Sequence, residues 1–141
     1  MPNIVAVKNP APPASAVAGH LQELRATVAP GFSLGYSVDW NAAEAMLAGA
    51  DAWYSVVGGL FPVACLEIVA AVRRGDAAEA RRLDARLKPL WELFSEFSSL
   101  RVVYAAANLL GICSAQPPCP ILPLPTAAQL RIAAVLAELG E

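Results

Sequence analysis

The sequence predicts an α/β fold whose first half alternates strands with helices and whose second half is helical. Short apolar runs of strand length recur three times before residue 58, each run is followed by helical spacing, and no strand pattern returns after Gly75. Continuous apolar strands that alternate with helices indicate parallel strands covered by helices. We therefore expect two parts, residues 1–75 with three strand–helix units and residues 76–141 with helices alone.

The three strand–helix units are marked by turn residues. Prolines cluster over residues 9–13, Pro30 and Gly31 end the first helix, and Gly58 and Gly59 form a tight turn. Pro62 suits the first turn of the third helix. The expected elements are, in order, strand 3–7, a helix with apolar positions from 17 to 28, strand 32–36, helix 40–48, strand 52–57 and a helix from residue 62 to about residue 74.

The second half predicts three helices. Asp76 with Glu79 three residues later predicts an N-cap for one long helix whose apolar positions continue to Leu93. A second helix is expected over residues 100–110, and the proline-rich residues 116–125 predict an extended crossover. Thr126 is expected to cap the last helix.

Composition excludes several classes of protein. The 141 residues are 57% hydrophobic and 16% charged, which is too apolar for a disordered chain. The net charge is −2 and there is no cationic block, so a nucleic-acid surface is not expected. Proline and glycine interrupt the longest uncharged stretches, so no membrane span is expected, and the first residues lack the pattern of a signal peptide.

Three cysteines indicate the redox setting. They are odd in number and have no C-x-x-C spacing, which argues against a disulfide framework and against a zinc site. We expect buried thiols, a reducing cytoplasmic compartment, and no metal or cofactor.

Lys8 is the strongest candidate for a catalytic residue. It closes the apolar run 4–7, and the carboxyl end of a parallel strand is where α/β proteins place their sites. Apolar walls would lower the pKa of a lysine and free its amine to attack a carbonyl. From the residues alone, Lys8 is either such a nucleophile or an ordinary lysine at a strand end that extends into water.

A series of segments resembles the dihydrodipicolinate synthase and N-acetylneuraminate lyase family. Their order and spacing carry the resemblance over nearly the whole chain. The segments are Ile-Val-Ala-Val-Lys-Asn at 4–9, Phe-Ser-Leu-Gly-Tyr-Ser-Val-Asp at 32–39, Ala-Gly-Ala-Asp-Ala-Trp-Tyr-Ser-Val at 48–56 before Gly-Gly-x-x-Pro at 58–62, Gly-Asp-Ala-Ala-Glu-Ala-Arg at 75–81, Leu-Lys-Pro-Leu at 87–90 and Pro-Ile-Leu-Pro-Leu at 120–124.

The resemblance implies a fold and an activity. The family folds as a TIM (β/α)8 barrel with extra C-terminal helices, so residues 1–75 would be strands six to eight with their helices, and residues 76–141 the helical region. Lys8 falls on the lysine that forms a Schiff base with pyruvate or a related 2-keto acid. The family has residues on earlier strands that complete the reaction, so the chain alone is expected to be incomplete and inactive. The resemblance also implies a homo-oligomer.

Five further residues are carried over as substrate-binding candidates. Tyr54 falls where the family's backbone meets pyruvate, although its side chain could be barrel core. Ser37 and Asp39 fall on the Gly and the Asp of a turn after the seventh strand, and Asp39 could instead cap the next helix. Gly58 and Gly59 lie at the mouth, where they let the backbone approach a ligand or only make the turn.

Some features leave the function open. Residues 9–12, Asn-Pro-Ala-Pro, replace the acidic residue, small hydroxyl residues and glycine that commonly follow the family's lysine, so the second substrate and the reaction direction are not assigned. His20 is expected on a helix face without a catalytic role. The rival hypothesis is a non-catalytic half-barrel that serves interaction or assembly, because three parallel strands alone leave two unpaired edges.

Overall fold

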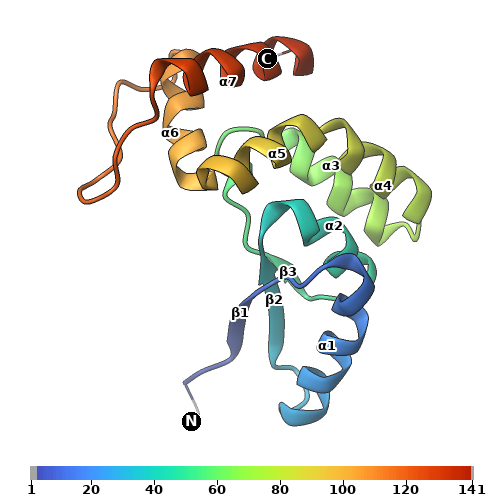
Figure 1. Cartoon of the computed structure of the whole chain (residues 1–141). Coiled ribbons are helices and arrows are strands. Elements are labelled where there is room, and N and C mark those ends of the chain that lie inside the picture. Colours follow the sequence, from blue (N-terminus) through green and yellow to red (C-terminus); the bar gives the residue numbers. More distant parts are fainter. Residues whose placement is uncertain (1–2, 141) are drawn as a thin grey trace.

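A computed structural model describes residues 3–140 of the chain. Three strands alternate with α1 and α2 in the first part of the chain, and a succession of helices follows, as Figure 1 shows. In chain order the elements are β1 (Ala6–Pro10), α1 (Ala14–Thr27), β2 (Ser33–Ser37), α2 (Asp39–Leu47), β3 (Ala52–Trp53), a 3-10 turn η1 (Val57–Gly59), α3 (Pro62–Arg73), α4 (Ala77–Arg86), α5 (Lys88–Phe97), α6 (Ser99–Leu109) and α7 (Thr126–Leu139). The α/β class is confirmed.

The strands form one parallel sheet in the order β1-β2-β3. Lys8 is paired with Gly35, and Gly35 with Ala52. β1 starts and ends three residues later than predicted, because pairing with β2 sets the strand and continues to Pro10. A proline costs no bond to β2 there, because donors toward β2 alternate along the strand and the N–H of the next residue, Ala11, donates to the carbonyl of Ser37. β3 is much shorter than predicted, since the chain turns into η1 after Tyr54 bonds to the carbonyl of Tyr36.

One face of the sheet is covered by α1 and α2. Leu34 and Tyr36 point to this face and are almost completely buried against Val17, Leu21 and a few alanines. Side chains alternate along a strand, so Lys8 and Gly35 lie on the opposite face. In Figure 1, α1 and α2 lie along one side of the sheet, and α3 to α7 lie beyond the carboxyl ends of the strands.

The first predicted helix of the second half is two helices. Asp76 caps α4 as expected, since its carboxylate accepts a bond from the N–H of Glu79 at 3.0 Å. The helix ends at Arg86, and α5 begins at Lys88 with Pro89 in its first turn. Pro89 has no N–H to continue the helical bonding pattern, so the uninterrupted helix was a wrong prediction.

The last two helices are joined by the proline-rich crossover, which is irregular as predicted. The guanidinium of Arg101 holds it by donating to the carbonyls of Leu122 and Pro123 at 2.8 and 3.2 Å. The side-chain amide of Asn108 donates to the carbonyl of Ala115 and accepts a bond from the N–H of the same residue. Thr126 does not cap α7; it is the first helical residue, and Pro125 occupies the cap position.

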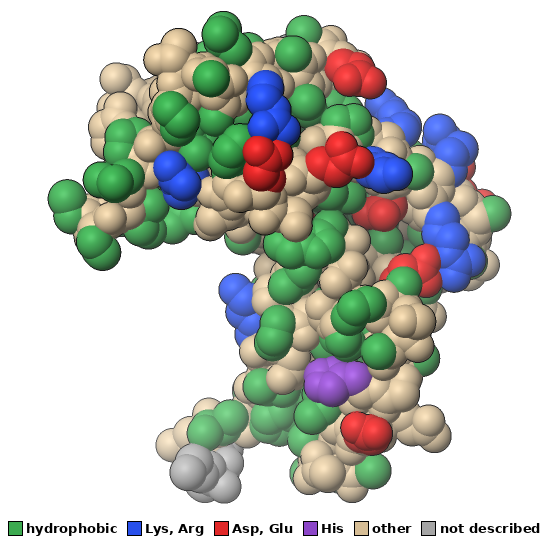
Figure 2. Space-filling model, in the orientation of Figure 1, with side chains coloured by type: hydrophobic (Ala, Val, Ile, Leu, Met, Phe, Trp, Pro, Cys, Tyr) green, Lys and Arg blue, Asp and Glu red, His purple; other side chains and the backbone are tan. Residues whose placement is uncertain are grey.

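Most of the buried apolar residues form one large cluster. It extends from α2 and η1 through α3 to α7, and Ile68, Phe94, Val102 and Ile132 are at its centre. No helix within residues 3–140 combines the length and the hydropathy that crossing a bilayer needs. In the view of Figure 2, acidic and basic side chains are interspersed over the helical part.

Candidate functional site

Lys8 lies two residues before the end of β1, on the sheet face that α1 and α2 leave open. Its neighbours Val7 and Asn9 are less exposed and point to the helical side. Lys8 itself is exposed, so the apolar walls expected around its amine are not formed by residues 3–140. The structure therefore bears out the placement of Lys8 near a strand end but not its predicted burial.

Tyr54 is brought onto the same face by the middle strand. Its ring crosses from the end of β3 to Gly35, where a Cβ atom would overlap Cε2 of the ring and lie 2.9 Å from Cδ2. Gly35 is the register partner of Lys8, and neighbouring strands are about 4.8 Å apart. The structure thus brings Lys8 and Tyr54 to the same open face, next to one another across β2, and the Tyr54 side chain is 36% exposed.

Ser37 ends β2 on this face. Its hydroxyl donates to the carbonyl oxygen of Asn9 at 3.2 Å, and the backbone carbonyl of Ser37 accepts a bond from the N–H of Ala11 at 3.0 Å. Both bonds tie the carboxyl ends of β1 and β2 together just beyond Lys8. Within the described part of the chain, the hydroxyl of Ser37 thus already has a partner.

Asp39 is buried, with 3% of its surface exposed. Its carboxylate accepts bonds from the backbone N–H groups of Val56 and Val57 at 3.1–3.2 Å and from the indole of Trp53 at 2.8 Å. It does not cap α2, whose cap position is taken by Val38 in a left-handed conformation (φ 70°), so the capping alternative was wrong. Asp39 instead fixes the segment that follows β3.

The two mouth glycines differ in their surroundings. The N–H of Gly58 donates to the hydroxyl of Ser55 at 2.8 Å, and a Cβ at Gly58 would lie 3.2 Å from the same oxygen. Gly59 has open space around it, with no atom of the described chain within 4 Å of a Cβ position. A side chain at Gly58 would therefore press on Ser55, whereas the surroundings of Gly59 leave room beside the backbone.

The cysteines do not share one environment. Cys65 is buried below this turn, 3.8 Å from the Ser55 hydroxyl, and burial raises the pKa of its thiol to about 11. Cys113 and Cys119 are exposed, so the prediction of buried thiols is right for one residue and wrong for two. All three thiols are free.

His20 lies on the helix side of the sheet and has a role that the sequence did not suggest. Its Nδ1 atom is 2.8 Å from the Tyr36 hydroxyl, and the two rings meet edge to face at 5.7 Å between centroids. Burial raises the pKa of the Tyr36 phenol. A histidine that pairs with a buried tyrosine across a helix and a strand leaves no spacing signal in the sequence.

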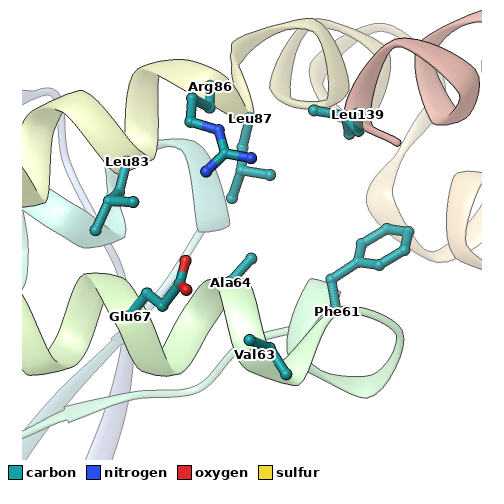
Figure 3. Close-up of a pocket in the computed structure, with 8 residues that line it drawn as sticks. All are labelled: Phe61, Val63, Ala64, Glu67, Leu83, Arg86, Leu87 and Leu139. Atoms are coloured by element: carbon teal, nitrogen blue, oxygen red, sulfur yellow. The ribbon is translucent and has the colours of Figure 1, made fainter. Parts of the chain in front are cut away.

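A cavity of about 220 Å³ lies elsewhere, between α3, the junction of α4 and α5, and the end of α7. Figure 3 shows Glu67 and Arg86 directed into it from opposite walls, with Phe61 and Leu139 at its far end. None of the residues predicted for the site lines it. Residues 3–140 contain no group of three His, Cys, Asp or Glu side chains placed to hold a metal ion. The open sheet face is therefore the better candidate site.

Comparison with known proteins assigns a family. The family model of the dihydrodipicolinate synthetase family matches residues 1–139. The 4-hydroxy-tetrahydrodipicolinate synthases of Rhodopseudomonas palustris and Acidiphilium cryptum are 32% and 34% identical to this chain over 97% and 99% of its length, but 46% of theirs. A solved dihydrodipicolinate synthase from Agrobacterium tumefaciens is 50% identical, with a TM-score of 0.93, and is covered over 47% of its chain. The chain spans about half the length of the curated relatives it matches.

Proposed function

The chain belongs to the dihydrodipicolinate synthetase family, and from this premise we propose that Lys8 is the Schiff-base lysine of a lyase acting on pyruvate or a related 2-keto acid. The observation that carries the proposal is the position of Lys8 on the open face of the parallel sheet, near its carboxyl edge and beside Gly35 and Tyr54. Active sites of α/β barrels lie at that edge of the strands.

The proposed chemistry needs one neutral amine and a carbonyl. The Nζ of Lys8 attacks the keto carbon, and loss of water leaves an iminium ion. The iminium withdraws electrons, so C3 loses a proton and an enamine forms. The enamine carbon then bonds to an aldehyde or an imine, and water finally releases the lysine; cleavage follows the same steps in reverse.

The proposed architecture follows from the same premise. β1, β2 and β3 would be strands six to eight of a TIM barrel, and residues 76–141 its C-terminal helical region. The relatives' chains are about twice as long, which supports this assignment. Strands before β1 would supply the walls around Lys8 and the groups that hold the keto-acid carboxylate, so residues 1–141 alone would not complete the reaction.

The site proposal gives supporting roles to Asp39, Gly59 and Ser37. Asp39 would hold the 55–59 segment beside the ligand through its bonds to Val56 and Val57. Gly59 would leave space for the ligand at the mouth, as its open surroundings permit. Ser37 would keep the ends of β1 and β2 together and leave its backbone beside the ligand.

Borohydride reduction tests the proposal. Treatment with pyruvate and borohydride should increase the mass of the peptide that contains Lys8 by the mass of pyruvate, minus one water and plus two hydrogen atoms. Lys8→Arg should abolish the adduct. Lys88→Arg is the matched control, because Lys88 is the only other lysine and lies exposed on α5. Circular dichroism of each variant shows whether it is folded.

A chimaera keeps the test decisive if the chain alone does not fold. This chain would replace the matching 47% of the Agrobacterium tumefaciens relative, whose fold agrees with a TM-score of 0.93. An adduct on Lys8 of the chimaera supports the proposal. A folded chimaera with no adduct on Lys8 contradicts it.

The rival function is a non-catalytic assembly module, favoured by Ile4 and Val5, which are 53% and 68% exposed beside the free edge of β1. A folded chain that self-associates with rising concentration in sedimentation experiments, without a carbonyl adduct, supports this alternative. Homo-oligomers that do form the adduct agree with the enzyme and with its predicted self-association. A cytoplasmic location remains a prediction, and cell fractionation would test it.

A further inference from the structure

A groove of about 420 Å³ lies between the first turn of α2 and the helices α4 and α5. Trp40 lines it from α2, Asp84 from α4, and Lys88, Trp91 and Glu92 from α5. Two indole rings and two carboxylates thus border one groove, and none of the residues proposed for the Lys8 site lines it.

The walls of this groove come from the middle of the described structure. α2 follows β2, the middle strand of the sheet, and packs against α1, α3, α4 and α5. In Figure 1, α2 lies between α1 and the helices α3 to α5. Strands that complete a barrel would join the free edges, β1 and β3, and their helices would flank α1 and α3. The groove is therefore formed by described residues, away from both edges.

Asp84 is a half-buried carboxylate in this groove. The indole N–H of Trp91, which is 5% exposed, donates to one oxygen of Asp84 at 3.1 Å and holds the carboxylate beside its ring. Within residues 3–140 no ion pair reaches Asp84, whereas Glu44 and Glu79 each pair with an arginine. Burial raises the pKa of Asp84, as expected of a carboxylate without a compensating cation.

We propose that this groove binds a small organic cation with a guanidinium group, which pairs with Asp84 and stacks on the indole of Trp40. A guanidinium is planar, donates two parallel N–H groups to a carboxylate and stacks on aromatic faces. It is more weakly hydrated than an ammonium group, so its transfer to a groove with two indoles costs less. The Trp40 side chain is 36% exposed and therefore open to a ligand. The site is separate from Lys8 and does not rest on the proposed function.

Lys88 sets the charge of the groove. It is the one basic residue that lines the groove, against the carboxylates of Asp84 and Glu92. Within the described residues Lys88 forms no ion pair. The lining therefore has one negative charge in excess, which suits a singly charged cation, and the ammonium group of Lys88 opposes that cation.

Three compounds of similar length test the inference: butylguanidinium, butylammonium and the neutral butylurea. The readout is the indole N–H signals of nitrogen-15-labelled protein at constant ionic strength, assigned with Trp→Phe variants. We expect the Trp40 and Trp91 signals to shift with half-saturation at about 1 mM butylguanidinium, at about five-fold more butylammonium, and not with butylurea. The Trp53 signal is the internal reference, because its indole bonds to Asp39 outside the groove. The chimaera serves if the chain alone does not fold.

Three variants should change the affinity for butylguanidinium in different directions. Asp84→Asn keeps an acceptor for the Trp91 indole, so the protein should stay folded while binding weakens about ten-fold. Trp40→Leu removes the stacking wall and should weaken binding about three-fold. Lys88→Gln removes the opposing charge and should strengthen binding about two-fold. Glu23→Gln is the matched control, because it deletes an exposed carboxylate on α1 outside the groove.

The outcomes are decisive for the groove alone. Shifts of the Trp40 and Trp91 signals that weaken in Asp84→Asn but not in Glu23→Gln support the inference. No shift in folded protein overturns it, and so does an unchanged affinity in Asp84→Asn. Equal affinity for butylguanidinium and butylurea also overturns it, since charge would then play no part. None of these results depends on an adduct at Lys8, so the two proposals can fail separately.

Discussion

The two hydrophobic clusters of the chain differ in size and in their relation to the candidate site. The larger one joins α3 to α7 and contains most of the fully buried bulky side chains, among them Ile68, Phe94 and Val102. The smaller one lies between the sheet and α1, and Leu34 and Tyr36 are its largest members. The open sheet face with Lys8 belongs to neither. Stability is therefore concentrated away from the residues proposed for chemistry.

Phe94→Ala should give the largest loss of stability. Phe94 is 1% exposed and packs on Trp91 with ring centroids 5.7 Å apart, so its removal leaves a large cavity in the larger cluster. We expect the free energy of unfolding to fall by about 3–5 kcal/mol. Urea unfolding followed by far-ultraviolet circular dichroism measures it.

Leu34→Ala, in the smaller cluster, should lower the free energy of unfolding by about 2–5 kcal/mol. If the clusters unfold together, both variants shift one transition; two separate transitions would show that they are independent.

Asp39→Ala should give the next largest loss of stability. It removes the acceptor of the Val56 and Val57 N–H groups and of the Trp53 indole, and the Val57 N–H is then left buried without its partner. We expect a loss of about 2–3 kcal/mol and faster proteolysis in segment 55–59. Asp76→Ala is the matched control, because it deletes an exposed carboxylate that caps α4 and should cost about 1 kcal/mol. Equal losses in both variants would contradict a special role for Asp39.

The sequence predicted helix starts well where a local residue determines them. Pro62 opens α3 and Asp76 caps α4, because each acts on backbone groups within a few residues. It failed at two local signals, the helix break at Pro89 and the cap at Thr126, and also where the determining contact is distant. The limits of β1 depend on pairing with β2, and Asp39 has its partners at residues 53 to 57 rather than in its own helix.

The candidate site shows the same division. The placement of Lys8 near a strand end followed from the apolar run before it. The approach of Tyr54 to Gly35 could not be predicted, because it depends on the register of two neighbouring strands and on a ring that crosses between them. The pairing of His20 with Tyr36 is equally non-local. Burial of Lys8 was predicted from an environment that the described residues do not supply.

Asp84→Asn should produce a smaller effect of opposite sign. Burial raises the pKa of the Asp84 carboxyl, and the indole of Trp91 donates to it at 3.1 Å. A carboxyl group with a raised pKa in the folded protein stabilises the fold at low pH, where it is protonated. This stability is lost as pH rises from the pKa of the unfolded chain through the pKa of the folded protein, because the ionised form is disfavoured by burial. We expect asparagine, which keeps the acceptor, to raise the free energy of unfolding at pH 7 by no more than about 1 kcal/mol, because the group is partly solvated. The gain should vanish near pH 3; a gain that persists there contradicts the assignment.

Asp51→Asn, in the sheet half, should give a change of similar size with the reverse pH dependence. The N–H of Leu34 donates to the Asp51 carboxylate at 2.7 Å and Arg25 donates to the same oxygen at 2.8 Å, and these contacts lower the pKa of Asp51. A lowered pKa gives stability that is present above the unfolded value near 4 and is lost as pH falls through the folded value. The pair is about 40% exposed on both sides, so we expect a loss of about 0.5–1 kcal/mol at pH 7 that disappears below about pH 3. Arg25→Gln leaves the bond from the Leu34 N–H to Asp51 in place and should therefore lose less stability than Asp51→Asn. An equal loss of stability in both variants would assign the effect to the Arg25–Asp51 ion pair instead of the backbone bond.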